Sequence, residues 1–184
     1  ASVSETYVNI IWVMAAITLL VGNISAVLQT STKRMLAYSS VAHAGYMLLA
    51  LLAANSYSNS AILFYTAAYS IASIGTFCIL NMVAHSKGGD KVEAFNGLGK
   101  TNPMIAFVMT LALISLAGIP PTAGFFAKYY IFTSAFYSGY TGLVLIAVIA
   151  SLIGVYYYFQ IIIAMYFKES SDEVVVVQNN QQLL

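Results

Sequence analysis

The chain has 184 residues, of which 60% are hydrophobic and 7% are charged, and its formal net charge is +1. Soluble domains carry about 25% charged residues, so the composition excludes a soluble protein and predicts an integral membrane protein. The small net charge gives no reason to expect a nucleic-acid partner. The single cysteine, Cys78, leaves too few sulfurs for disulfides, zinc clusters or iron–sulfur ligation.

Five apolar segments predict an all-α integral membrane fold with five transmembrane helices. Polar turns separate the segments, and a long polar connector precedes the fourth of them. Residues 1–168 are therefore predicted to form one five-helix membrane repeat, followed by a polar tail over residues 169–184. The predicted spans are residues 7–28, 35–54, 61–84, 103–137 and 142–167.

The fourth segment is too long to be one membrane-spanning helix. Its 35 residues would extend for roughly 50 Å as a continuous helix, against a hydrocarbon core of about 30 Å. Pro120 and Pro121 lack the backbone N–H that a helix interior requires, while Gly118 and Gly124 tolerate non-helical angles. We therefore predict two half-helices joined by an unwound stretch at Gly118–Gly124.

Lys128 is the single charged residue of this fourth segment. It precedes Tyr137 by nine residues, about 13 Å of helix rise, which is farther than a lysine comfortably reaches. Charges at such depth are rare and costly, and a broken helix beside one is typical of ion or proton sites in transporters. The alternative is a kinked helix whose lysine extends to the interface. We favour the functional interpretation.

The basic residues of the predicted loops all fall on one side of the membrane. By the positive-inside rule this side is cytoplasmic, or faces the matrix in a mitochondrion. Five spans also place the two ends on opposite sides, so a homologous unit joined to this one would be inverted, as is common in transporters. The six residues are Lys33, Arg34, Lys87, Lys91, Lys100 and Lys168.

Two further spans carry polar side chains at helical spacing. His43 shares one face of the second span with Ser39 and Tyr46, and histidine can hold or pass a proton near neutral pH. A neutral core histidine bonded to serine or tyrosine is an equally good interpretation. Tyr65 and Tyr69 belong to a hydroxyl stripe on the third span, where a water chain is possible and helix packing is favoured.

The run Gly97-Leu98-Gly99-Lys100-Thr101 superficially resembles a phosphate-binding loop. The pattern fails because the first glycine that such a loop requires is replaced by Ala94, and Pro103 follows where the loop's helix would continue. The sequence contains no dinucleotide fingerprint, metal cluster or nucleophile–base pair elsewhere. We therefore expect no cofactor in this chain and any redox chemistry in other chains.

Several motifs resemble the antiporter-like membrane subunits of respiratory complex I. The resemblance covers nearly the whole chain up to about Lys168 and implies a central line of protonatable residues that includes Lys128 and His43. The motifs are Ala26-Val27-Leu28-Gln29-Thr30, Lys33-Arg34-Met35-Leu36-Ala37-Tyr38-Ser39-Ser40-Val41-Ala42-His43-Ala44-Gly45-Tyr46, Phe95-Asn96-Gly97-Leu98-Gly99-Lys100, and Leu116-Ala117-Gly118-Ile119-Pro120-Pro121-Thr122-Ala123-Gly124-Phe125-Phe126-Ala127-Lys128.

Among the types within this family, the residues look most like subunit N, which is subunit 2 of the mitochondrial enzyme. The subunit L type has the pattern His-x-x-x-His-x-x-x-Lys where this chain has Tyr65, Tyr69 and Ser73. The subunit M type usually has glutamate at the position of Lys128. The candidate site residues are therefore Lys128, His43 and Tyr69.

The family's subunits contain two inverted five-helix repeats, and the residues here resemble the second repeat alone. We expect a fragment, a split gene product or a partial chain that would hold half of a proton path. The resemblance implies a proton-translocating membrane-arm subunit of NADH:quinone oxidoreductase, without a redox site of its own. The alternatives are a subunit of a multi-subunit sodium/proton antiporter and a purely structural helix bundle.

The implied partners are the lipid bilayer and the other membrane subunits of complex I, both antiporter-like and small. The implied location is the bacterial inner membrane, with the mitochondrial inner membrane as the alternative. In either case the loops that carry Lys33, Arg34 and the residues from Lys87 to Lys100 are expected on the cytoplasmic or matrix side.

Overall fold

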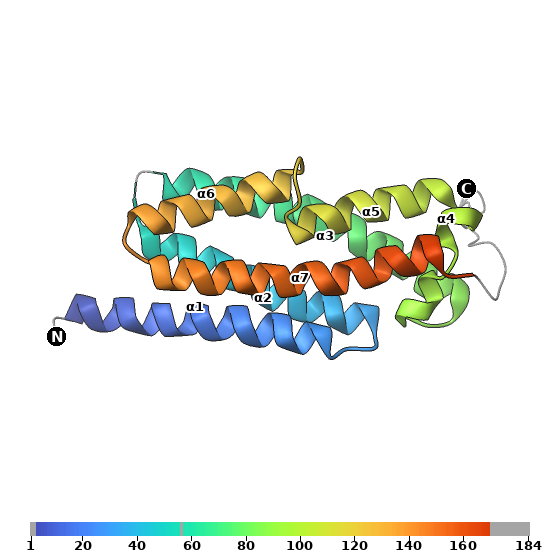
Figure 1. Cartoon of the computed structure of the whole chain (residues 1–184), viewed down its shortest axis with the longest axis horizontal. Coiled ribbons are helices and arrows are strands. Elements are labelled where there is room, and N and C mark those ends of the chain that lie inside the picture. Colours follow the sequence, from blue (N-terminus) through green and yellow to red (C-terminus); the bar gives the residue numbers. More distant parts are fainter. Residues whose placement is uncertain (1–2, 56, 170–184) are drawn as a thin grey trace, which may run out of the picture.

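The computed structural model describes residues 3–55 and 57–169, and these form an elongated bundle of helices (Figure 1). From residue 170 on, the predicted polar tail of residues 169–184 lies outside the described residues. A long connector after the third helix carries a 3-10 turn and one short helix. The elements are α1 (Val3–Val27), α2 (Thr32–Ala53), α3 (Ser58–Lys87), η1 (Val92–Phe95), α4 (Leu98–Thr101), α5 (Pro103–Ala117), α6 (Ala123–Tyr137) and α7 (Thr141–Phe167).

Four of these helices, α1, α2, α3 and α7, are long and apolar enough to cross a membrane. Helices α5 and α6 have 15 residues each, so each extends for about 22 Å, less than a hydrocarbon core of about 30 Å. Within the described residues the regular structure is helical, apart from one isolated bridge between Ser31 and Lys91. The all-α membrane class expected from the composition is confirmed.

The chain leaves the helical path between α5 and α6. Gly118 has a left-handed φ of 81°, and its N–H donates to the carbonyls of Ile114 and Ser115. Thr122 begins α6 because its side-chain oxygen accepts from the N–H of Phe125. Figure 1 shows the two helices following each other along one side of the bundle, with the non-helical link between them.

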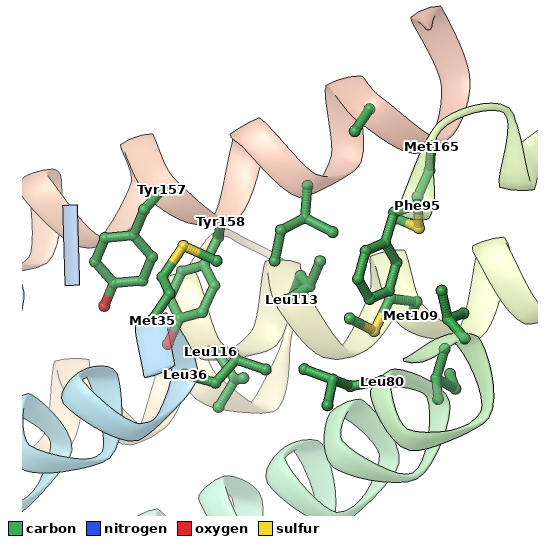
Figure 2. Close-up of a cluster of buried hydrophobic side chains, with 14 of the residues drawn as sticks. Met35, Leu36, Leu80, Phe95, Met109, Leu113, Leu116, Tyr157, Tyr158 and Met165 are labelled. Carbon is green, nitrogen blue, oxygen red and sulfur yellow. The ribbon is translucent and has the colours of Figure 1, made fainter. Parts of the chain in front are cut away.

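Two clusters of buried apolar side chains fill the interior. One cluster, around Phe95, Leu113 and Met165, joins α1, α2, α3, α5 and α7 to the connector (Figure 2). The other joins α1, α2, α3, α6 and α7. Tyr69 packs against both clusters, so its side chain marks the place where they meet.

The loops that carry basic residues gather at one end of the bundle. The α1–α2 turn, the connector after α3 and the end of α7 lie at this end, and the α2–α3 and α6–α7 turns lie at the other (Figure 1). The N–H of Thr32 donates to the carbonyl of Asp90 at 2.7 Å, and the hydroxyl of Ser31 donates to the carboxylate of Asp90. These bonds fasten the α1–α2 turn to the connector.

Candidate functional site

Lys128 is buried inside the bundle, with 6% of its surface exposed. Its Nζ donates to the carbonyl of Ala117 at 2.8 Å and to the hydroxyl of Ser151 at 2.9 Å. Nζ also lies 5.0 Å from the centroid of the Tyr46 ring, whose π face attracts a cation. An ammonium group has three N–H donors, so two oxygens and one ring can accommodate all of them.

The break between α5 and α6 creates the carbonyl partner of Lys128. In a continuous helix the carbonyl of Ala117 would accept from the residue four positions later, but that residue is Pro121, which has no N–H. The carbonyl is therefore free for the lysine. A Cβ added to Gly118 would lie 2.7 Å from Cδ of Lys128, so the glycine also leaves the space through which the lysine stem passes.

His43 is the second candidate residue and is likewise buried, at 4% exposure. Its Nδ1 lies 2.6 Å from the hydroxyl of Tyr65, and its Nε2 lies 3.3 Å from the hydroxyl of Tyr158. A tyrosine hydroxyl can donate or accept a hydrogen bond. The imidazole can therefore keep a partner at each nitrogen in both its neutral and its charged form.

Tyr69, the third candidate residue, lies against His43. The two rings stack with their centroids 4.5 Å apart and an angle of 29° between their planes. The stack holds the imidazole from the side of α3, while the hydroxyls of Tyr65 and Tyr158 hold its edge. The structure thus brings Tyr69 and His43 into direct contact.

A small cavity connects His43 to Lys128, and its interior has room for about one water molecule. Polar side chains from four helices border it, but most of its wall is apolar, and Leu116 is among the apolar lining residues. The polar lining residues are His43, Tyr65, Tyr69, Ser115 and Lys128.

Two polar residues of this region, Ser151 and Asn23, were missed by the sequence reasoning. Asn23 is buried in α1 and its side-chain oxygen accepts from the hydroxyl of Tyr157 at 3.2 Å. An amide in the middle of an apolar span was a signal that could have been used. Ser151 gave no comparable signal, because a lone serine in a transmembrane helix is ordinary.

A second group of polar side chains lies at the opposite end of α6 and is here named the Asn55 clasp: Asn55, Ser58, Ser134 and Ser138. The amide nitrogen of Asn55 donates to the carbonyl of Ser134 and the hydroxyl of Ser138, both at 3.0 Å. Its amide oxygen accepts from the hydroxyls of Ser58 and Ser134. The clasp ties the α2–α3 turn to the last turn of α6.

A comparison with known protein families identifies the family of the chain. The family described as "NADH:quinone oxidoreductase/Mrp antiporter, TM" matches residues 1–154. The chain belongs to this family. It is a multi-pass membrane protein, and the resemblance to antiporter-like subunits of complex I that the sequence motifs indicated is confirmed.

Its relatives include NADH-quinone oxidoreductase subunit N of Cytophaga hutchinsonii, which is 50% identical over 143 residues, or 78% of this chain and 31% of that protein. Subunit N of Flavobacterium johnsoniae is 43% identical over 152 residues, or 83% of this chain and 33% of that protein. This chain therefore spans about a third of the length of these relatives. The similarity to the subunit N type is confirmed.

Solved structures of respiratory and antiporter complexes contain the same fold. A chain of respiratory complex I from Thermus thermophilus with bound aureothin is 34% identical with a TM-score of 0.80, covering 91% of this chain and 38% of that one. A chain of the membrane-bound sulfane sulfur reductase, an archaeal respiratory membrane complex, is 30% identical with a TM-score of 0.89, covering 97% and 37%. A chain of the Mrp complex from Dietzia sp. DQ12-45-1b is 26% identical with a TM-score of 0.86, covering 92% and 32%.

Proposed function

We propose that this chain forms part of a proton-translocating membrane-arm subunit of an NADH:quinone oxidoreductase, and that Lys128 and His43 hold and pass the proton. The observation that carries the proposal is a buried lysine and a buried histidine that line the same small cavity. The names of the relatives, NADH-quinone oxidoreductase subunit N, support the assignment to this complex.

The chemistry at Lys128 follows from its partners. The protonated amine is stabilised by the Ala117 carbonyl, the Ser151 hydroxyl and the Tyr46 ring. When a water molecule in the cavity accepts a proton from the ammonium, His43 lies on the far wall to receive it. Lysine suits this task because it can lose its proton when buried, whereas arginine remains protonated.

In the membrane, α5 and α6 together would form one broken span, which gives five spans in the repeat of residues 1–168. Each half is too short to cross alone, and the two halves follow each other along the bundle (Figure 1). The basic end would then face the cytoplasm, or the matrix in a mitochondrion. Cysteines placed at Gly89 and Gly139, in a background without Cys78, would report opposite sides of the membrane. Labelling of both positions from one side would contradict this topology.

The partners that we propose are the other membrane subunits of the complex, with the redox centres in other chains. A subunit of an Mrp-type sodium/proton antiporter is the second candidate, favoured by the structural likeness to the Dietzia Mrp complex. Mass spectrometry of the chains that copurify with the full-length subunit would separate the two. Proton pumping coupled to NADH oxidation in sodium-free buffer supports the first candidate, and sodium-dependent exchange without NADH supports the second.

The central test replaces Lys128 in the full-length subunit of the assembled complex. Lys128→Arg should keep the charge and the assembly but lose proton pumping in sealed vesicles, and Lys128→Ala should lose pumping as well. Lys100→Arg, at an exposed lysine of the connector, is the matched control and should pump normally. Normal proton-to-electron stoichiometry in Lys128→Arg would mean that Lys128 is a fixed charge, and the proposed mechanism would be wrong.

A further inference from the structure

Lys128 has two oxygen partners of different chemical kinds. The Ala117 carbonyl can accept a hydrogen bond and has no proton to donate. The Ser151 hydroxyl, 2.9 Å from Nζ, can do both. A protonated lysine can use both oxygens as acceptors, but a neutral amine also presents a lone pair that needs a donor. Within this pair of oxygens, Ser151 alone can supply that donor.

Tyr46 completes the surroundings of the amine. Its ring faces Nζ of Lys128 at 5.0 Å, and its hydroxyl donates to the carbonyl of Ala147 at 3.5 Å. The Tyr46 hydroxyl therefore keeps an acceptor whichever way the Ser151 proton points. Ser151 can accept from the ammonium or turn its proton to the neutral amine, so each protonation state of the lysine has a hydrogen-bond arrangement.

Ser151 lies on α7 among buried small residues, Ala147, Ala150 and Gly154. Gly154 packs against Asn23 of α1, and small side chains let helix backbones approach closely in membranes. The long side chain of Lys128 spans the distance from α6 and brings Nζ within 2.9 Å of the Ser151 hydroxyl.

We propose that Ser151 is a positioning residue that lets Lys128 change its protonation state, by accepting from the ammonium and donating to the neutral amine. The hydroxyl holds Nζ in one place in both states by turning its own proton. This role rests on the proposed function of Lys128 as a proton carrier. It adds a residue of α7 to the candidate site, whose residues Lys128, His43 and Tyr69 come from α6, α2 and α3.

The test compares Ser151→Val with Ser151→Thr in the full-length subunit of the assembled complex. The two variants have nearly the same shape, but threonine keeps the hydroxyl and valine lacks it. We expect Ser151→Val to assemble normally and to pump several-fold more slowly, because both forms of the amine lose this partner. Ser151→Thr, which keeps the hydroxyl, should retain most of the pumping.

Equal behaviour of the two variants would overturn the inference. If both pump normally the hydroxyl is dispensable, and if both fail together the position matters for packing alone. Lys128→Ala, measured alongside, distinguishes a failure of the role of Ser151 from a failure of the role of Lys128. Lost pumping in Lys128→Ala with equal Ser151 variants overturns the role of Ser151 and leaves the proposed function intact. Normal pumping in Lys128→Ala overturns the proposed function and, with it, this inference.

Discussion

The two polar clusters attached to α6 differ in the chemistry of their side chains. The Asn55 clasp, at the end of the helix, contains an amide and hydroxyls that bond to one another and to backbone carbonyls. The cluster around Lys128 and His43, at the other end, contains two ionisable groups and a cavity. Both contain buried side chains, although Asn55 and Ser138 of the clasp are only half-buried, and both join segments that are far apart in the sequence.

This difference leads us to expect different roles for the two clusters. The clasp has no side chain that gains or loses a proton near neutral pH, so we expect its hydrogen bonds to rigidify the helix end. The cluster around Lys128 and His43 contains side chains that can change their protonation state, so its hydrogen bonds can follow a moving proton. We therefore expect damage to the clasp to reduce assembly, and damage at the Lys128 end to reduce pumping in complexes that still assemble.

Breaking the clasp should have the largest effect. Asn55→Leu removes the amide that donates to the carbonyl of Ser134 and accepts from the hydroxyls of Ser58 and Ser134, which are 2% and 3% exposed. The two hydroxyls keep each other as partners, but the Ser134 proton and carbonyl lose theirs. We expect a loss of roughly 3 kcal/mol in stability, since buried polar groups without partners are expensive. The amount of assembled complex after detergent extraction measures it.

Asn59→Leu is the matched control, because Asn59 is exposed in the first turn of α3. It should assemble normally. The complexes that survive in Asn55→Leu should pump with the usual proton-to-electron ratio. If Asn55→Leu instead gave a normal amount of complex with a reduced proton-to-electron ratio, the clasp would belong to the proton path. The expected difference between the two clusters would then be wrong.

Replacing the histidine should have the next largest effect, on pumping instead of assembly. His43→Gln keeps hydrogen-bonding atoms between Tyr65 and Tyr158 but cannot carry a proton at working pH. We expect near-normal assembly and pumping reduced by roughly tenfold, equivalent to about 1.4 kcal/mol in the barrier for transfer. His85→Gln, at an exposed position near the end of α3, should leave both quantities unchanged. Equal pumping in the two variants would exclude His43 from the path.

Gly118 and Gly139 allow a smaller and more specific perturbation of the lysine. Both have left-handed φ values, 81° and 87°, so alanine should cost each site about 1 kcal/mol of backbone strain. A Cβ at Gly118 would also lie 2.7 Å from Cδ of Lys128, whereas a Cβ at Gly139 meets no atom within 4 Å. Gly118→Ala should therefore pump several-fold more slowly than Gly139→Ala at similar assembly. Equal pumping rates would show that the position of the lysine stem is not critical.

The sequence predicted the parts of this molecule that depend on local chemistry. Composition identified a helical membrane protein, and the motifs around His43 and Lys128 identified the family. Pro121 removes an N–H, so the sequence already implies a free carbonyl four residues earlier, at Ala117. The choice of Lys128, His43 and Tyr69 as site residues stays a prediction, although the structure places them around one cavity.

The remaining features depend on packing between distant segments. The Asn55 clasp joins residues 79 positions apart, and the bond between Ser39 and Tyr158 spans 119 positions. No periodicity within one helix can indicate which face of another helix it will meet. Ser151 is the clearest case, because its role as a partner of Lys128 follows from the crossing of α6 and α7 and not from its own neighbours in the chain.

The smallest effect should come from Tyr69, and it tests how the imidazole is held. Tyr69 contributes its ring to a stack on His43, whereas Tyr65 contributes a hydroxyl to Nδ1 at 2.6 Å. Tyr69→Phe keeps the ring and should retain most of the pumping, with a change of about twofold or less, since loss of one peripheral hydroxyl costs well under 1 kcal/mol here. Tyr65→Phe removes the hydrogen bond that orients the imidazole and should pump more slowly than Tyr69→Phe, at equal assembly. Tyr69→Leu, which removes the ring, should fall between the two. If Tyr69→Phe instead pumps as poorly as Tyr65→Phe, the Tyr69 hydroxyl takes part in proton transfer through the cavity, whereas the present geometry gives Tyr69 only a stacking contact with His43.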